Sequence, residues 1–198
     1  MRYRATIIVL GIVLGFGVVS SSPADAAPAG GGNNIVIANN TTDGYTLVRS
    51  NALVARDPAD TVANNNLAIA NSTTCTTGCH TVAVAMQVVI VESYPSTFIP
   101  ANVASATNGG CDSCVTEAYA FQHFVQPGVS VNLGADAQQA LAALRQQVRD
   151  VAAADLPILD RKAALEQLFD QMVAVVDQGI QAVGGNPVGS TSESSQAA

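Results

Sequence analysis

The fold is decided by a stretch that occurs twice, first as Asn66-Leu67-Ala68-Ile69-Ala70 and again as Asn102-Val103-Ala104-Ser105-Ala106. Each copy continues into a cysteine pair and a Thr-x-Ala-x-Ala-x-Gln segment, which are Cys75, Cys79 and Thr81 to Gln87 in the first copy and Cys111, Cys114 and Thr116 to Gln122 in the second. Nine positions recur, at an offset of 36 residues before the cysteines and 35 after them. Such a repeat indicates a duplicated structural unit, in which each copy buries a face against its neighbour.

The repeated segments alternate with a period of two. One phase holds Asn, Thr, Ala and Gln, and the other holds larger apolar side chains such as Ile35 and Ile37. Positions i, i+2 and i+4 share a face in a strand but not in a helix, so the alternation predicts five short strands within residues 34–133. Alanine favours helices, which leaves a helical alternative open for the alanine-rich segments, above all between Pro100 and Gly109.

The connections and the C-terminal part complete the expected fold. Asp43-Gly44 is typical of a hairpin turn and predicts antiparallel pairing of the strands on either side. After Gly134 the apolar period becomes about 3.6 residues and forms two stripes, separated by Asp155-Leu156-Pro157. We therefore expect an α+β fold: a duplicated antiparallel β unit with cysteine-paired loops, followed by a C-terminal helical hairpin that covers one side of the sheet.

The two ends of the chain differ in character from its middle. Residues 1–26 have the order of a secretory signal peptide, with basic residues, an apolar run and small residues, which predicts cleavage between Ala26 and Ala27. Residues 27–33 are expected as a flexible lead-in and residues 184–198 as a disordered tail, because both are rich in Gly, Ser or Ala. Residues 34–183 are expected as a single folded domain, with β-rich repeats over 34–133 and the helical hairpin over 135–183.

Charge and hydropathy indicate where the protein is located and which classes of partner it can bind. The formal net charge is −7 and the chain has one lysine, Lys162, which disfavours nucleic acid as a partner. Beyond the signal, the longest apolar run, Val82 to Val91, is too short to cross a bilayer as a helix. These features predict a protein that is secreted or held in the cell envelope, outside the cytoplasmic membrane, with an envelope protein or a cell-surface component as its partner.

The four cysteines allow three interpretations. In an exported chain they are expected to form two disulfides, and we expect the local pairs Cys75 with Cys79 and Cys111 with Cys114, although pairing between the repeats also satisfies the count. A second interpretation is a thiol-disulfide oxidoreductase that uses Cys111 and Cys114 as a Cys-x-x-Cys centre. A third is a structural zinc site of four thiolates, with His80 as a spare nitrogen ligand.

The sequence shows no recognisable set of catalytic residues. The chain has two histidines, His80 and His123, which are expected as a loop residue and a partly exposed strand residue. No metalloprotease His-Glu-x-x-His, Gly-x-Ser-x-Gly or phosphate-binding glycine loop occurs. We therefore expect no enzyme, no cofactor and no metal ligand set in the main interpretation.

Asn-x-Ala-x-Ala, the cysteine pair and Thr-x-Ala-x-Ala-x-Gln together resemble the extracytoplasmic repeat domain of bacterial proteins labelled peptide zinc metalloproteases. The resemblance covers about residues 34–144. It implies an accessory exported domain without peptidase activity, because the protease motif of those proteins is absent here and no catalytic residue of theirs corresponds to a position in this chain.

Overall fold

The structure, a computed structural model, describes residues 32–73 and 75–198. The strands wind in successive coils: β1 (Asn34–Asn39), β2 (Thr46–Asp57) and β3 (Thr61–Val62), then β4 (Asn65–Ser72), β5 (His80–Val91) and β6 (Thr97–Phe98), then β7 (Ala101–Asn108) and β8 (Val115–Gln126). Helices α1 (Ala135–Ala153) and α2 (Ile158–Ala182) and strand β9 (Val188–Ala197) follow. The expected α+β class and the two C-terminal helices are confirmed. The predicted signal peptide and most of the lead-in lie outside the described residues.

Each strand pairs with its counterpart in the next coil. The sheets β1-β4-β7, β2-β5-β8 and β3-β6 are built of parallel pairs, so the expected antiparallel unit is wrong. The hairpin at Asp43-Gly44 is wrong too, because β1 and β2 belong to different sheets. The register reproduces the sequence repeat, with Asn66 opposite Asn102 and Thr81 opposite Thr116. The repeat length is therefore the length of one coil of a parallel β-solenoid.

The interior of the solenoid explains why the pairing is parallel. The phase that holds Asn and Ala faces inward, and Asn34 Nδ2 donates to Asn66 Oδ1 (2.9 Å) while Asn66 Nδ2 donates to Asn102 Oδ1 (2.8 Å). Such a ladder requires identical residues to stack about 4.8 Å apart, which an in-register parallel pair provides and a hairpin does not. Fully buried alanines fill the remaining space, namely Ala68, Ala70, Ala83, Ala85, Ala118 and Ala120. Only small side chains fit between the two closely spaced sheets, so alanine occupies strand positions here despite its helical propensity.

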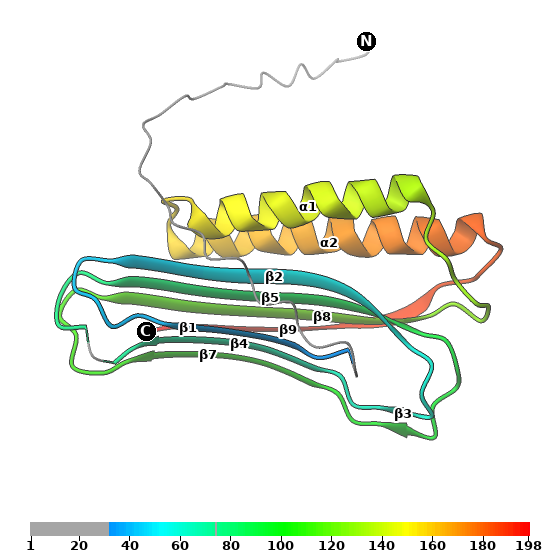
Figure 1. Ribbon diagram of the computed structural model, residues 1–198, viewed down its shortest axis with the longest axis horizontal. Helices are drawn as coiled ribbons and strands as arrows, with labels where there is room; N and C mark the ends of the chain where they lie inside the picture. The colour runs from blue at the N-terminus through cyan, green and yellow to red at the C-terminus, as the bar shows by residue number, and fades with distance from the viewer. Residues whose placement is uncertain (1–31, 74) are drawn as a thin grey trace, which may run out of the picture.

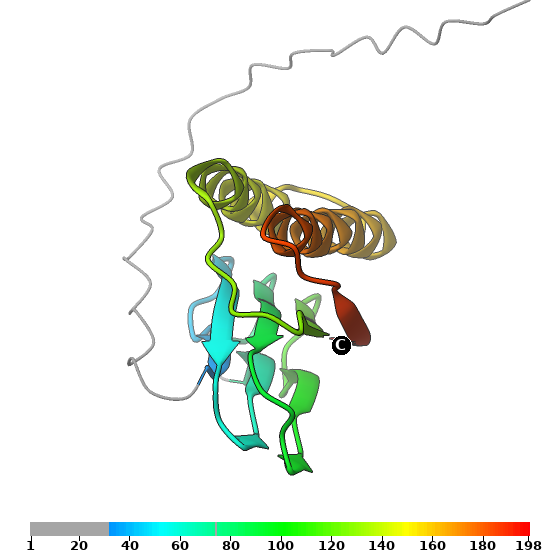
Figure 2. The same cartoon turned by 90° about the vertical axis from the view of Figure 1, so that its right-hand side faces the viewer.

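The helical hairpin covers the outer face of the sheet β2-β5-β8 (Figures 1 and 2). That face presents large apolar side chains, including Val84 and Met86 of β5 and Phe121 of β8, which are fully buried. The apolar stripes of α1 and α2 pack onto them, and the Phe121 and Phe169 rings lie 5.5 Å apart. Burial of this apolar area is the main stabilisation that the helices provide.

The C-terminal segment is not a disordered tail. Residues 188–197 form β9, which pairs antiparallel with β8 at the last coil. Ser194 Oγ accepts a hydrogen bond from the Ala104 backbone N–H (3.1 Å), and Gln196 Oε1 accepts one from that of Ala106 (3.0 Å). The polar composition that suggested disorder instead supplies side chains that satisfy the open edge of β7, so β9 caps the end of the solenoid.

Candidate functional site

The turns that join the first two strands of each coil stack along one edge of the solenoid. Gly44 N–H donates to Thr77 O (3.0 Å), and Gly78 N–H donates to Asp112 O (3.1 Å). Gly78 has a φ of +64°, a left-handed conformation that glycine adopts without strain. The Asp43 carboxylate accepts hydrogen bonds from the Thr76 N–H (2.5 Å) and hydroxyl (2.7 Å), which hold the pKa of Asp43 below its usual value. The second and third of these turns carry the cysteines.

The stacking brings all four cysteines into one cluster. Cys75 Sγ lies next to Cys79 Sγ and Cys111 Sγ lies next to Cys114 Sγ, so each turn brings its own two sulfurs together. The four Sγ atoms lie within 4.8 Å of one another, and Cys75 Sγ is 3.8 Å from Cys114 Sγ and 3.9 Å from Cys111 Sγ in the next coil. Cys75 and Cys79 are buried, whereas Cys111 and Cys114 are partly exposed. The repeat predicted equivalent positions for the two pairs, but only the coil geometry places them side by side.

The atoms around the sulfurs favour an uncharged sulfur state. Thr42 O lies 3.2 Å from Cys79 Sγ and 3.6 Å from Cys75 Sγ, where it would repel a thiolate. Among the described residues, the Cys79 N–H donates to Cys114 Sγ (3.2 Å). The turn after Cys111 and Cys114 leads into a strand, β8, and not into a helix whose N-terminus could lower a cysteine pKa. These surroundings suit disulfides better than a redox-active thiolate.

A buried ionic cluster beside the turns was not found from the sequence. Glu117 of β8 accepts hydrogen bonds from His80 Nε2 (2.9 Å), from Arg161 Nη1 (2.6 Å to Oε2) and from the Tyr119 hydroxyl. Arg161 is fully buried and also donates from Nη2 to Ala154 O (2.7 Å), in the link between α1 and α2. A usable signal existed, because Arg161 stands four residues before Leu165 on the apolar stripe of its helix.

This cluster joins the helical hairpin to the sheet. Burial by itself raises the pKa of Glu117, but the hydrogen bonds from His80, Tyr119 and Arg161 outweigh it and hold the pKa below its ordinary value. Burial, together with the adjacent Glu117, raises the pKa of Tyr119 far above its ordinary value. Glu117 is therefore ionised and Tyr119 neutral at neutral pH. The cluster links α2 and the α1–α2 connection to β5 and β8.

The two histidines lie in different strands and contact different partners. His80 is the first residue of β5 and not a loop residue, and its ring is engaged by Glu117. His123 on β8 is buried instead of partly exposed, and its Nδ1 lies 2.7 Å from Thr191 Oγ1 of β9. Burial lowers the pKa of His123. His80 is not among the groups that the described structure brings together with the sulfurs as a possible metal site.

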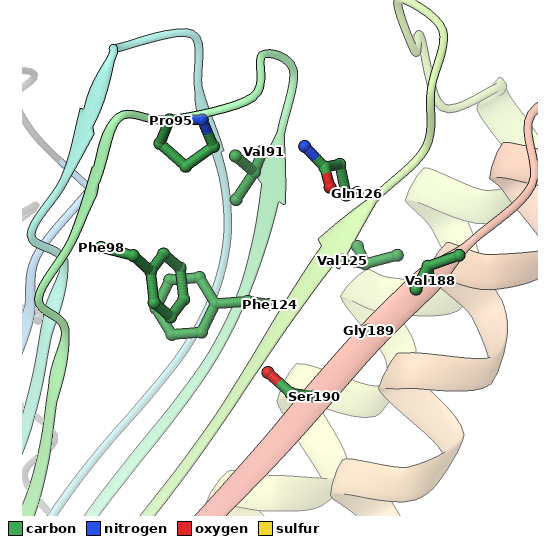
Figure 3. Close-up of a pocket in the computed structure, with 9 residues that line it drawn as sticks. All are labelled: Val91, Pro95, Phe98, Phe124, Val125, Gln126, Val188, Gly189 and Ser190. Atoms are coloured by element: carbon green, nitrogen blue, oxygen red, sulfur yellow. The ribbon is translucent and has the colours of Figure 1, made fainter.

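A pocket of about 280 Å³ lies at the opposite end of β8 from the cysteines (Figure 3). Phe98 and Phe124 form one wall, with ring centroids 4.9 Å apart and ring planes 77° apart, and Val188 of β9 stands on the other side. The Gln126 amide beside it already donates to Ser93 O (2.8 Å). None of the lining residues is an acid, a base or a nucleophilic thiol, so the pocket offers no catalytic group.

Neither a family model, nor a curated protein, nor a solved structure matches this chain. Neither helix of the described residues is long and apolar enough to cross a membrane.

Proposed function

We propose that this chain is an exported, non-catalytic structural or interaction module of a bacterial cell envelope, held together at its stacked turns by two disulfides. Its sequence supports export through the ordered basic, apolar and small residues of the first 27 positions. The single observation that carries the proposal is the clustering of all four cysteines, placed in local pairs, in adjacent turns along one edge of the solenoid. Oxidised cysteines fit an exported protein.

The stapling role follows from what the turns must do. A coil of a parallel solenoid has to reverse its direction between sheets. Each disulfide lowers the conformational entropy of the unfolded chain at one such turn, which stabilises the fold by about 2 kcal/mol. The cluster lies next to the Glu117 network, so the same edge of the solenoid also anchors the helices. We propose that the cysteines stabilise the fold and that any binding takes place at the outer surfaces of the solenoid.

A structural zinc site is the second candidate, and one distance favours it. Four thiolates around zinc at about 2.3 Å stand about 3.8 Å apart. Two of the separations between the turns have about this value, Cys75 Sγ to Cys114 Sγ (3.8 Å) and Cys75 Sγ to Cys111 Sγ (3.9 Å). Thr42 O beside Cys79 Sγ weighs against it, because a zinc-bound thiolate is better served by N–H donors than by a carbonyl oxygen. The thiol-disulfide oxidoreductase that uses Cys111 and Cys114 is disfavoured because a strand, and not a helix N-terminus, follows the pair.

The experiment measures thiols, metal and mass on one preparation of exported protein. We expect a chain that begins near Ala27, no titratable thiol in denaturant before reduction, and no stoichiometric zinc. Proteolytic mapping should recover the Cys75 to Cys79 bridge separately from the Cys111 to Cys114 bridge. Four titratable thiols together with one equivalent of zinc would reject the disulfide module in favour of the zinc domain.

The matching variant is Cys111→Ser with Cys114→Ser. We expect it to lower the free energy of unfolding by about 2 kcal/mol while the far-UV circular dichroism spectrum stays the same. The control is Ser113→Ala in the same turn, which leaves both cysteines in place. If the natural protein catalyses insulin reduction and the double variant loses that activity without losing stability, the oxidoreductase alternative replaces our proposal.

A further inference from the structure

The outer face of the sheet β1-β4-β7 is apolar although the helices leave it bare. The alternation directs Asn and Ala inward on these strands, so Ile and Leu point away from the solenoid interior. Ile35, Ile37 and Val103 are 54%, 49% and 43% exposed. Figures 1 and 2 place α1 and α2 on the far side of the solenoid, over β2-β5-β8. Of the two large sheets in the described part of the chain, one therefore has its outer apolar face covered and the other does not.

The register arranges this face in rows across the three strands. Two central rows are mainly aliphatic, the row at one side of them is polar, and the row at the other side holds one asparagine and one alanine. In order along the strands, the rows are Asn65 and Ala101; Ile35, Leu67 and Val103; Ile37, Ile69 and Ser105; and Asn39, Asn71 and Thr107. The outermost asparagines form their own ladder, in which Asn71 Nδ2 donates to Asn39 Oδ1 (2.8 Å). The two aliphatic rows therefore lie in the middle of the face.

The face is also free of charge. Strands β1, β4 and β7 contain no Asp, Glu, Lys, Arg or His, although the whole chain has a formal net charge of −7. Two copies that approach through other surfaces bring acidic groups together, which is unfavourable. At this face they bring none. An uncharged surface also offers no ion pair to an acidic or a basic partner.

We propose that this face binds the same face of a second copy of the chain. A two-fold axis brings aliphatic rows onto aliphatic rows, as an isologous interface requires. The two sheets would stack about 10 Å apart, as in other face-to-face sheet packings. The proposal goes beyond the disulfide module and is independent of the state of the cysteines.

The size of the face sets the expected strength. Three strands about 4.8 Å apart and four rows about 6.7 Å apart cover roughly 300 Å² in projection. Accessible area exceeds projected area, so two copies bury on the order of 1,000 Å² in total, at the low end for specific association. We expect a weak dimer, whose fraction rises between about 10 µM and 1 mM protein.

Sedimentation velocity of the mature protein over that concentration range tests the proposal. Ile37→Lys places a charge in the centre of the face, and we expect the midpoint of dimerisation to move at least tenfold higher in concentration. Ser105→Glu provides a second variant on the same row in case the first one unfolds. The control is Leu159→Lys on α2, where a side chain that is 77% exposed receives the same change outside the face.

Thermal unfolding followed by circular dichroism confirms that each variant keeps its fold. A natural protein that stays monomeric up to 1 mM overturns the proposal, whatever else the face binds. It is equally overturned if folded Ile37→Lys and Ser105→Glu variants dimerise like the natural protein, or if Leu159→Lys weakens the dimer as much as they do.

Discussion

Replacing Arg161 with methionine tests whether the ionic cluster anchors the helices to the sheet. Methionine keeps much of the length and the apolar stem of arginine, so the change removes mainly the guanidinium. Arg161 is fully buried, donates to both carboxylate oxygens of Glu117 and also donates to Ala154 O. Its loss leaves the Glu117 carboxylate, itself 1% exposed, buried without a full opposite charge.

The magnitude follows from that burial. Removing one partner of a buried ion pair costs about 3–5 kcal/mol, because the remaining charge stays desolvated. His80 and Tyr119 still donate to Glu117 and keep the cost in this range. For a domain of this size, the expected fall in the thermal midpoint is roughly 6–20 °C.

The pH dependence has a definite sign. The pKa of Glu117 lies below its ordinary value of 4.5 in the folded state, so its ionisation stabilises the fold above pH 4.5 and this contribution is lost as the pH falls through the folded pKa. Without Arg161 the Glu117 pKa rises. The difference in stability between the variant and the natural protein should therefore shrink as the pH falls from the raised Glu117 pKa of the variant to the lowered Glu117 pKa of the natural protein.

Urea unfolding followed by far-UV circular dichroism measures these differences, since the chain has no tryptophan to report by fluorescence. Arg149→Met is the control, because Arg149 lies on the exposed side of α1 and bonds to Gln146. A double variant, Glu117→Met with Arg161→Met, should recover much of the loss, because two apolar side chains leave no buried charge. The reasoning is refuted if Arg161→Met costs less than about 1 kcal/mol at pH 7, or if the double variant is no more stable than the single one.

Two further predictions concern the solenoid interior and its cap. Asn66→Ala should lower the free energy of unfolding by about 2–3 kcal/mol in a urea titration, because Asn66 Nδ2 donates inside the core to Asn102 Oδ1 and to two backbone carbonyls. The control, Asn71→Ala on the exposed ladder, should cost under about 0.5 kcal/mol, and equal costs for the two variants would contradict the interior ladder. A chain that ends at Gly185 lacks β9 and leaves the Ala104 backbone N–H without its acceptor, so light scattering at matched concentration should show more aggregation than for the full chain, and unchanged solubility and stability would show that β9 is dispensable.

The sequence allowed the elements to be predicted better than their arrangement. Period-two alternation located β1, β4, β5, β7 and β8 but not the short β3 and β6, and the change to a period of about 3.6 near Gly134 located both helices. Propensity was misleading at Ala101 to Asn108, where alanine is required by the narrow solenoid interior. Composition was misleading in β9, because Ser and Gln act there as hydrogen-bond acceptors at a sheet edge.

The sequence by itself determined that a unit repeats, that one coil is about 35 residues long and that the cysteines occupy equivalent places. Only the tertiary structure decided that the units stack in parallel, because alternation is the same for parallel and antiparallel strands. It also decided which phase faces inward and that Cys75 lies beside Cys114, 39 residues away. The physical reason is that these are contacts between coils: they depend on like side chains stacking at the distance between neighbouring strands, and no local pattern encodes that distance.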